Sequence, residues 1–88
     1  MNVDQQGILD GIHEVARRQL GFDGELRPEM RLSEDLELDS LKMLTLAVEV
    51  ENRFRVCLDP SSEAQIETVG DLVAAVGREL ERRTHDAA

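Results

Sequence analysis

Residues 38–54 read LDSLKMLTLAVEVENRF, and the periodicity of this stretch decides the fold. At 100° per residue, a helix over 40–54 separates its apolar side chains into two stripes. One stripe spans roughly 80° and should face a core: Met43, Leu46, Ala47, Val50 and Phe54. The other contains Leu41, Leu44 and Val48. A surface helix needs only one apolar stripe, so the second is either covered by another part of the chain or meets a partner.

On the N-terminal side, another helix is expected over about residues 3–20. Its apolar residues recur at spacings of three and four, and Gly21 stands where a C-terminal glycine ends a helix. The periodicity is then lost up to Asp39. Apolar residues still recur through this long loop and should fold it back onto the helices: Phe22, Leu26, Met30, Leu32, Leu36 and Leu38.

On the C-terminal side, two more helices are expected. Pro60 suits the start of a short helix over 61–66. Thr68 and Asp71 form a capping-box-like pair at the start of a last helix over 69–83.

The composition agrees with a small helical domain. The 88 residues suffice for one domain, which we expect to cover residues 1–88. Two Phe and no Trp or Tyr make the apolar content mostly aliphatic, which favours helices over sheets. The predicted fold is therefore all-α: a small four-helix bundle with a long loop between helices 1 and 2 and a short third helix.

The net charge limits the classes of partner that the chain is expected to bind. Nineteen acidic and ten basic residues give a net charge of −9, which disfavours nucleic acid and anionic membranes. The charge either complements basic patches on other proteins or only keeps the chain in solution. Neither a signal-peptide pattern nor an apolar run of membrane-spanning length is visible. We expect a cytoplasmic monomer without membrane insertion.

Residues suited to catalysis or metal binding are sparse. His13 and His85 are far apart in sequence, and the single Cys57 cannot form an internal disulfide. The acidic residues between 34 and 39 lack the glycine and terminal glutamate of a calcium loop. We expect no catalytic residue and no metal site, with His13 at the surface and Cys57 half-buried. The chain is not expected to be an enzyme.

Ser40 is the most informative single residue, because it stands where the loop ends and a helix begins. One interpretation is an ordinary helix cap, since Asp and Ser both favour that position. The other is an attachment point for a phosphate group, because helix N-termini favour negative charge. The position alone is compatible with both.

The surrounding residues indicate a family. Residues 35–41, DLELDSL, resemble the phosphopantetheine attachment motif of acyl carrier proteins, commonly D-L-G-x-D-S-L. Residues 19–22 (QLGF) are similar to the end of that family's first helix, and 66–72 (IETVGDL) to the start of its last. The second helix keeps the family pattern at four positions: Leu46, Val50, Glu51 and Phe54. The resemblance covers roughly residues 8–80 and agrees with a bundle of the acyl-carrier type.

The resemblance implies a carrier with a covalent cofactor. A phosphopantetheinyl transferase would move 4'-phosphopantetheine from coenzyme A onto Ser40, which lies between Asp39 and Leu41 of the cofactor-binding motif. The arm would hold an acyl or aminoacyl group as a thioester, supplied by a loading ligase and used by downstream biosynthetic enzymes. The face that meets these partners would consist of Leu41, Lys42, Leu44, Thr45 and Val48.

Departures from the family pattern favour a specialised pathway. Glu37 replaces the usual glycine, so the turn before Asp39 is expected to take a different backbone path. Lys42, Thr45 and Arg53 replace acidic residues common in fatty-acid carriers, which changes the partner surfaces that fit.

Two alternatives remain open. One is an aminoacyl or peptidyl carrier loaded by an adenylating ligase, because the motif does not specify the cargo. The other is an unmodified helical adaptor that uses the second apolar stripe only to bind a partner.

Overall fold

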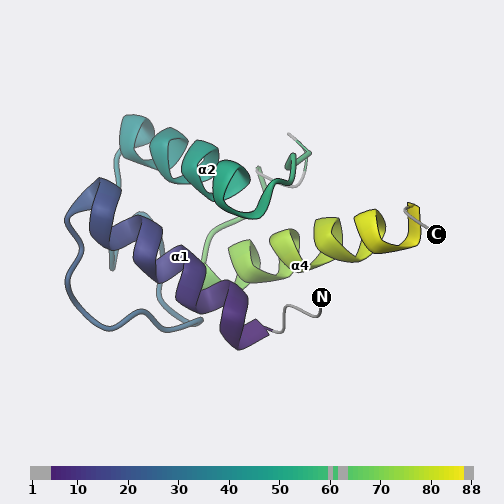
Figure 1. The fold of residues 1–88 in the computed structure, drawn as a ribbon. Coiled ribbons are helices and arrows are strands. Elements are labelled where there is room, and N and C mark those ends of the chain that lie inside the picture. Colours follow the sequence, from purple (N-terminus) through teal and green to yellow (C-terminus); the bar gives the residue numbers. More distant parts are fainter. Residues whose placement is uncertain (1–4, 60, 62–63, 87–88) are drawn as a thin grey trace.

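The computed structural model describes residues 5–59, 61 and 64–86, and this part of the chain contains three helices and no strand (Figure 1). They are α1 (Gln5–Leu20), α2 (Ser40–Phe54) and α4 (Val69–Asp86). The all-α prediction is therefore confirmed for the described residues. Positions 3 and 4 of the expected first helix lie outside them. Positions 62 and 63 of the expected short helix over 61–66 also lie outside them, and the prediction is wrong at its end, because residues 64 and 65 form a turn and 66 is not helical.

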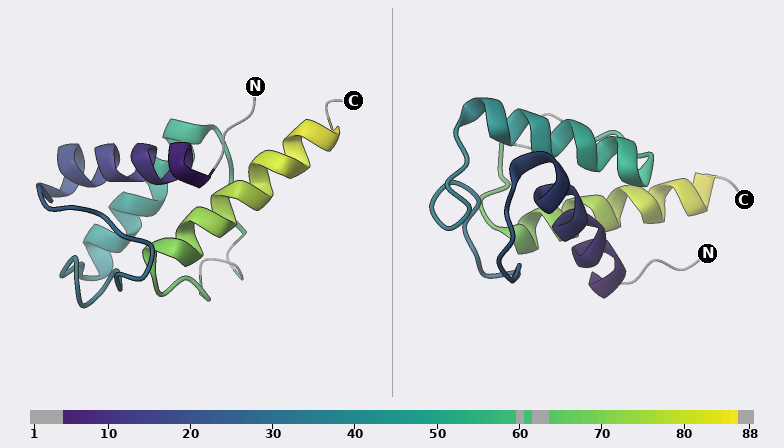
Figure 2. Two further views of the ribbon diagram at one scale, coloured as in Figure 1. Left: turned by 90° about the horizontal axis from the view of Figure 1, so that it is seen from below. Right: turned by 60° about the vertical axis from the view of Figure 1, so that its left-hand side comes forward.

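The arrangement of the helices centres on α1, which packs against both α2 and α4. Helices α1 and α2 run in roughly opposite directions (Figures 1 and 2). Gly11 allows their close approach, because a Cβ atom there would lie 2.5 Å from Phe54 Cζ. Glu14 Oε2 and Arg53 Nη2, 2.9 Å apart, form an ion pair across the same interface.

The long loop before α2 is tied to the start of α4. Leu32 N donates to Glu67 O at 3.0 Å, and Val69 N donates to Met30 O at 2.9 Å. The predicted folding back of the loop is confirmed, since four of its leucines are buried: Leu26, Leu32, Leu36 and Leu38. Gly21 ends α1 in the left-handed conformation, with φ of 71°, as predicted.

The core lies between the three helices and this loop. Leu46 and Val50 of the predicted inner stripe are buried, and Met43, Ala47 and Phe54 are half-buried. Buried side chains from α1 and α4 complete the core, the largest being Ile8, Ile12, Val69 and Val76.

The predicted capping box at the start of α4 is confirmed. Asp71 N donates to Thr68 Oγ1 at 3.1 Å, and the Asp71 carboxylate accepts from the backbone N–H groups of Glu67 and Thr68. The hydrogen bond from Glu67 N, followed by that from Thr68 N, lowers the pKa of Asp71 below its ordinary value of 3.8. These bonds favour the ionised carboxylate, so the cap is strongest when Asp71 is charged.

Two smaller expectations concern His13 and Cys57. His13 lies at the surface but is half-buried, with its Nε2 2.8 Å from Gly24 O and its ring in an edge-to-face arrangement with Phe22. Cys57 is exposed rather than half-buried, because buried Val56 and Leu58 on either side turn it outward.

Within the described ranges, no group of His, Cys, Asp and Glu residues is arranged to hold a metal ion. None of the helices there is long and apolar enough to cross a membrane.

Candidate functional site

The start of α2 is capped by Asp39. Its Oδ1 accepts a hydrogen bond from Lys42 N at 2.8 Å, and its backbone is extended, with φ of −86° and ψ of −176°. Asp39 O also accepts the first intrahelical bond, from Met43 N at 2.8 Å. These are the defining contacts of an N-cap residue. The cap interpretation of Ser40 is therefore wrong.

The Ser40 side chain is left available for chemistry. It is the first residue of α2 and is exposed, and its hydroxyl makes no hydrogen bond within the described part of the chain. The unpaired backbone N–H groups and the dipole of the first turn favour negative charge there. The arrangement suits a hydroxyl that becomes a phosphodiester.

Glu37, three residues before Ser40, has φ of 54°. This left-handed conformation normally favours glycine. Buried Leu36 and Leu38 fix it on both sides, and Leu38 N donates to Leu32 O at 3.3 Å. Glu37 thus adopts a backbone conformation that glycine favours, and the different backbone path expected for this turn stays a prediction.

The second apolar stripe of α2 is exposed. Leu41 is 72%, Leu44 61% and Val48 43% accessible, so the loop does not cover them. Thr45 is half-buried, and its Oγ1 donates back to Leu41 O at 3.0 Å. Lys42 beside them is also exposed. The structure thus brings all the predicted partner-binding residues into the first turns after Ser40.

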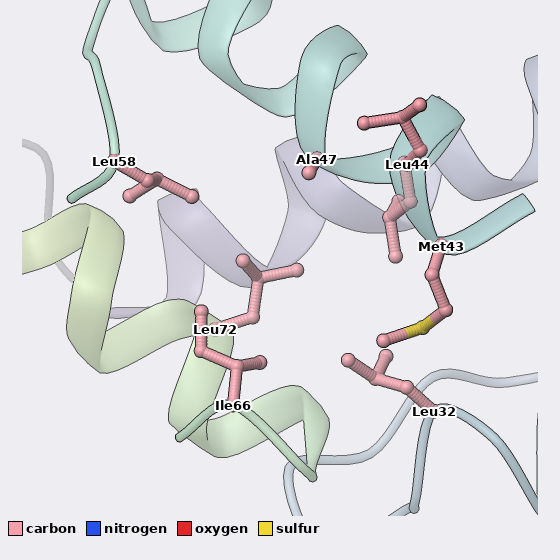
Figure 3. A pocket seen from close by; sticks show the side chains of 8 residues that line it. Leu32, Met43, Leu44, Ala47, Leu58, Ile66 and Leu72 are labelled. Atoms are coloured by element: carbon pink, nitrogen blue, oxygen red, sulfur yellow. The ribbon is translucent and has the colours of Figure 1, made fainter. Parts of the chain in front are cut away.

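Sequence reasoning missed an apolar cavity beside this stripe. It has a volume of about 190 Å³ and lies between α2, the start of α4 and the two loops that flank α2. Figure 3 shows side chains from these elements turned toward a common space. The cavity is lined by Leu32, Met43, Leu44, Leu46, Ala47, Leu58, Ile66 and Leu72. Leu44 therefore belongs both to the exposed stripe and to the cavity wall.

The sequence of the chain is similar to those of proteins that carry phosphopantetheine. The family model described as "Phosphopantetheine attachment site" matches residues 10–76. The meromycolate extension acyl carrier protein of Mycobacterium tuberculosis is 36% identical over 89 residues, which cover all of this chain and 76% of the relative. An acyl carrier protein of Myxococcus xanthus is 33% identical over 70 residues, covering 78% of this chain and 89% of that one.

A solved structure gives the same result for the fold. A chain from Mycobacterium tuberculosis assigned as an acyl carrier protein superposes with a TM-score of 0.74 at 30% identity. The match covers 78% of this chain and 93% of that one. Fold and site thus define a small helical carrier whose prosthetic group is attached covalently.

The chain belongs to the acyl carrier protein family. Members of this family are carriers and not enzymes, and their cofactor is 4'-phosphopantetheine. The carrier interacts with a phosphopantetheinyl transferase and with biosynthetic enzymes.

Proposed function

We propose that Ser40 carries the phosphopantetheine arm, between Asp39 and Leu41 of the cofactor-binding motif. The observation that carries this proposal is the division of roles at the start of α2. Asp39 supplies the cap, and the exposed Ser40 hydroxyl has no hydrogen bond within the described residues. An unmodified adaptor would not need a free hydroxyl at this position, so this observation favours the carrier.

The attachment reaction needs little from the carrier itself. The Ser40 oxygen bonds to the phosphorus that carries the pantetheine of coenzyme A, and 3',5'-ADP leaves with the broken phosphoanhydride bond. The hydroxyl proton passes to the transferase or solvent. The new phosphodiester carries one negative charge, which the N-terminal end of α2 stabilises. A thioester on the arm can then reach several enzymes at high effective concentration.

We further propose an acyl cargo in a specialised pathway. The chain resembles a carrier named for meromycolate extension, and the cavity beside α2 has only apolar side chains in its wall. A cavity of about 150 Å³ is enough to hold benzene, so one of about 190 Å³ can take several methylene groups. Such a wall offers no partner to a charged amino group, which disfavours the aminoacyl alternative.

Several further points belong to the same proposal. Residues 1–88 form a single carrier domain. The chain acts as a cytoplasmic monomer. Its partner-binding face consists of Leu41, Lys42, Leu44, Thr45 and Val48. The support for this face is the exposure of its three apolar side chains.

The direct test is intact mass spectrometry after incubation with coenzyme A, magnesium and a broad-specificity phosphopantetheinyl transferase. The wild-type chain should gain one phosphopantetheine and Ser40→Ala none. Ser33→Ala, which removes another exposed serine, should be modified like the wild type. Addition to Ser40→Ala, or no addition to the wild type, would refute the proposed attachment.

The cargo is tested on the modified protein. Acyl-adenylating and aminoacyl-adenylating ligases are supplied separately with ATP and their substrates, and the mass of the carrier is followed. We expect thioesters of long acyl chains to accumulate. Loading with amino acids alone would establish the aminoacyl alternative instead.

A further inference from the structure

Helix α2 is neutral in a strongly acidic chain. It contains two basic residues, Lys42 and Arg53, and two acidic ones, Glu49 and Glu51. The net charge of −9 therefore lies entirely outside the helix that begins at Ser40. A partner that approaches this helix meets a different electrostatic surface from the rest of the molecule.

Contacts inside the molecule engage two of these four charges. The Glu51 carboxylate accepts a hydrogen bond from Leu58 N at 2.7 Å, which fastens the segment after α2. Arg53 pairs with Glu14 of α1. Lys42 and Glu49 make no ion pair within the described part of the chain, and Lys42 is exposed whereas Glu49 is half-buried.

The charge of Lys42 is not directed at the arm. Residues two positions apart on a helix do not face each other, so Lys42 and Ser40 project from different sides of α2. Lys42 instead borders the exposed stripe, one residue after Leu41 and three before Thr45. A contact that covers Leu41 and Thr45 therefore reaches the Lys42 ammonium.

We infer that the transferase that modifies Ser40 in the source organism docks an apolar surface on Leu41 and Val48 and places a carboxylate opposite Lys42. An enzyme that reacts with the Ser40 hydroxyl lies against the first turn of α2, and if its contact extends across exposed Leu41 to Thr45 it reaches Lys42 at the other edge of the stripe. Burying the lysine without an acidic partner would cost its desolvation. A basic surface would meet it as a like charge. The inference rests on Ser40 being the modified residue.

The test compares two charge reversals of equal size in transfer assays with that transferase. Lys42→Glu removes the proposed contact. Arg78→Glu changes the net charge equally at another exposed cation without an ion pair among the described residues, on α4. We expect Lys42→Glu to raise KM for the carrier roughly tenfold, and Arg78→Glu to change it less than about twofold. The increase should shrink at high salt, because screening weakens the repulsion.

Both variants should keep their helical circular dichroism, since glutamate is favourable in the first turn of α2. A fall in KM for Lys42→Glu, equal shifts in both variants, or no shift in either would overturn the inference while leaving modification of Ser40 intact. Absence of transfer to the wild-type chain would instead refute the proposed attachment, and the inference with it.

Discussion

At the scale of single residues, the site depends on two neighbours with different roles. Asp39 and Ser40 are both residue types that favour helix caps, so sequence reasoning could not assign the cap to either. The bond from Lys42 N to Asp39 Oδ1 assigns it to Asp39. Glu37 likewise could be recognised as unusual for the motif, but its left-handed backbone is set by the burial of Leu36 and Leu38 on either side.

The cap assignment predicts unequal effects for neighbouring substitutions. Asp39→Ala should lower the free energy of unfolding by about 1 kcal/mol, because the first turn of α2 loses its acceptor. Ser40→Ala should change it by less than about 0.5 kcal/mol, as expected for an exposed side chain without a hydrogen bond. Urea denaturation followed by circular dichroism measures both. A larger loss for Ser40→Ala than for Asp39→Ala would contradict the assignment.

The backbone of Glu37 gives a second prediction. Glu37→Gly should raise the free energy of unfolding by about 0.5–1 kcal/mol, because relief of left-handed strain exceeds the entropic cost of glycine. Glu29→Gly is the matched control in the same loop, at a residue without positive φ. It should lower stability by a similar amount. Destabilisation by both substitutions would show that the Glu37 conformation carries no strain.

At the scale of helices, periodicity and end signals predicted most of what is observed. The bounds of α2 and the capping box of α4 followed from local patterns, which tertiary packing preserved. Whether Leu41, Leu44 and Val48 are exposed could not be predicted, because the answer depends on the path of the loop before α2. That path is fixed by backbone bonds between residues far apart in sequence, such as Leu32 to Glu67.

The α4 cap predicts a pH dependence. The lowered pKa of Asp71 means that its contribution to stability is present above its ordinary value of 3.8 and is lost as the pH falls through the lower folded value. The difference in Tm between the wild type and Asp71→Ala should therefore be largest at neutral pH and shrink below about pH 4. Thermal melts over this range measure it.

Asp71→Asn is the control for this measurement. The amide oxygen of Asn accepts hydrogen bonds but does not titrate. The difference in Tm between Asp71→Asn and Asp71→Ala should therefore be the same at every pH. A constant difference between the wild type and Asp71→Ala from neutral to strongly acidic pH would contradict the role of the carboxylate.

At the scale of the whole molecule, the two apolar stripes of α2 have different surroundings. The inner stripe joins the core, and the outer one stays exposed beside an apolar cavity. The fold class could be predicted because the spacing of apolar residues along each helix indicates which of its faces is buried. The cavity could not, because its wall combines side chains from α2, α4 and two loops, and its volume depends on how closely these pack.

These surroundings predict different costs for the same substitution on one helix. Leu46 is 2% accessible, and Leu46→Ala should lower the free energy of unfolding by about 2–5 kcal/mol through lost burial and a new void. Leu44→Ala should cost less than about 1 kcal/mol, because most of its side chain is already in solvent. Chemical denaturation compares them. Similar losses would mean that the outer stripe is part of the folding core.

We expect Ser40 to carry a phosphopantetheine thioester in growing cells. The most direct measurement is mass spectrometry of the intact chain and its Ser40 peptide, purified from the source organism without added transferase. We predict one phosphopantetheine on Ser40, with an acyl group on a fraction of the molecules, and none on a Ser40→Ala chain expressed in its place. An unmodified Ser40 in growing cells, or the arm on another residue, would contradict it.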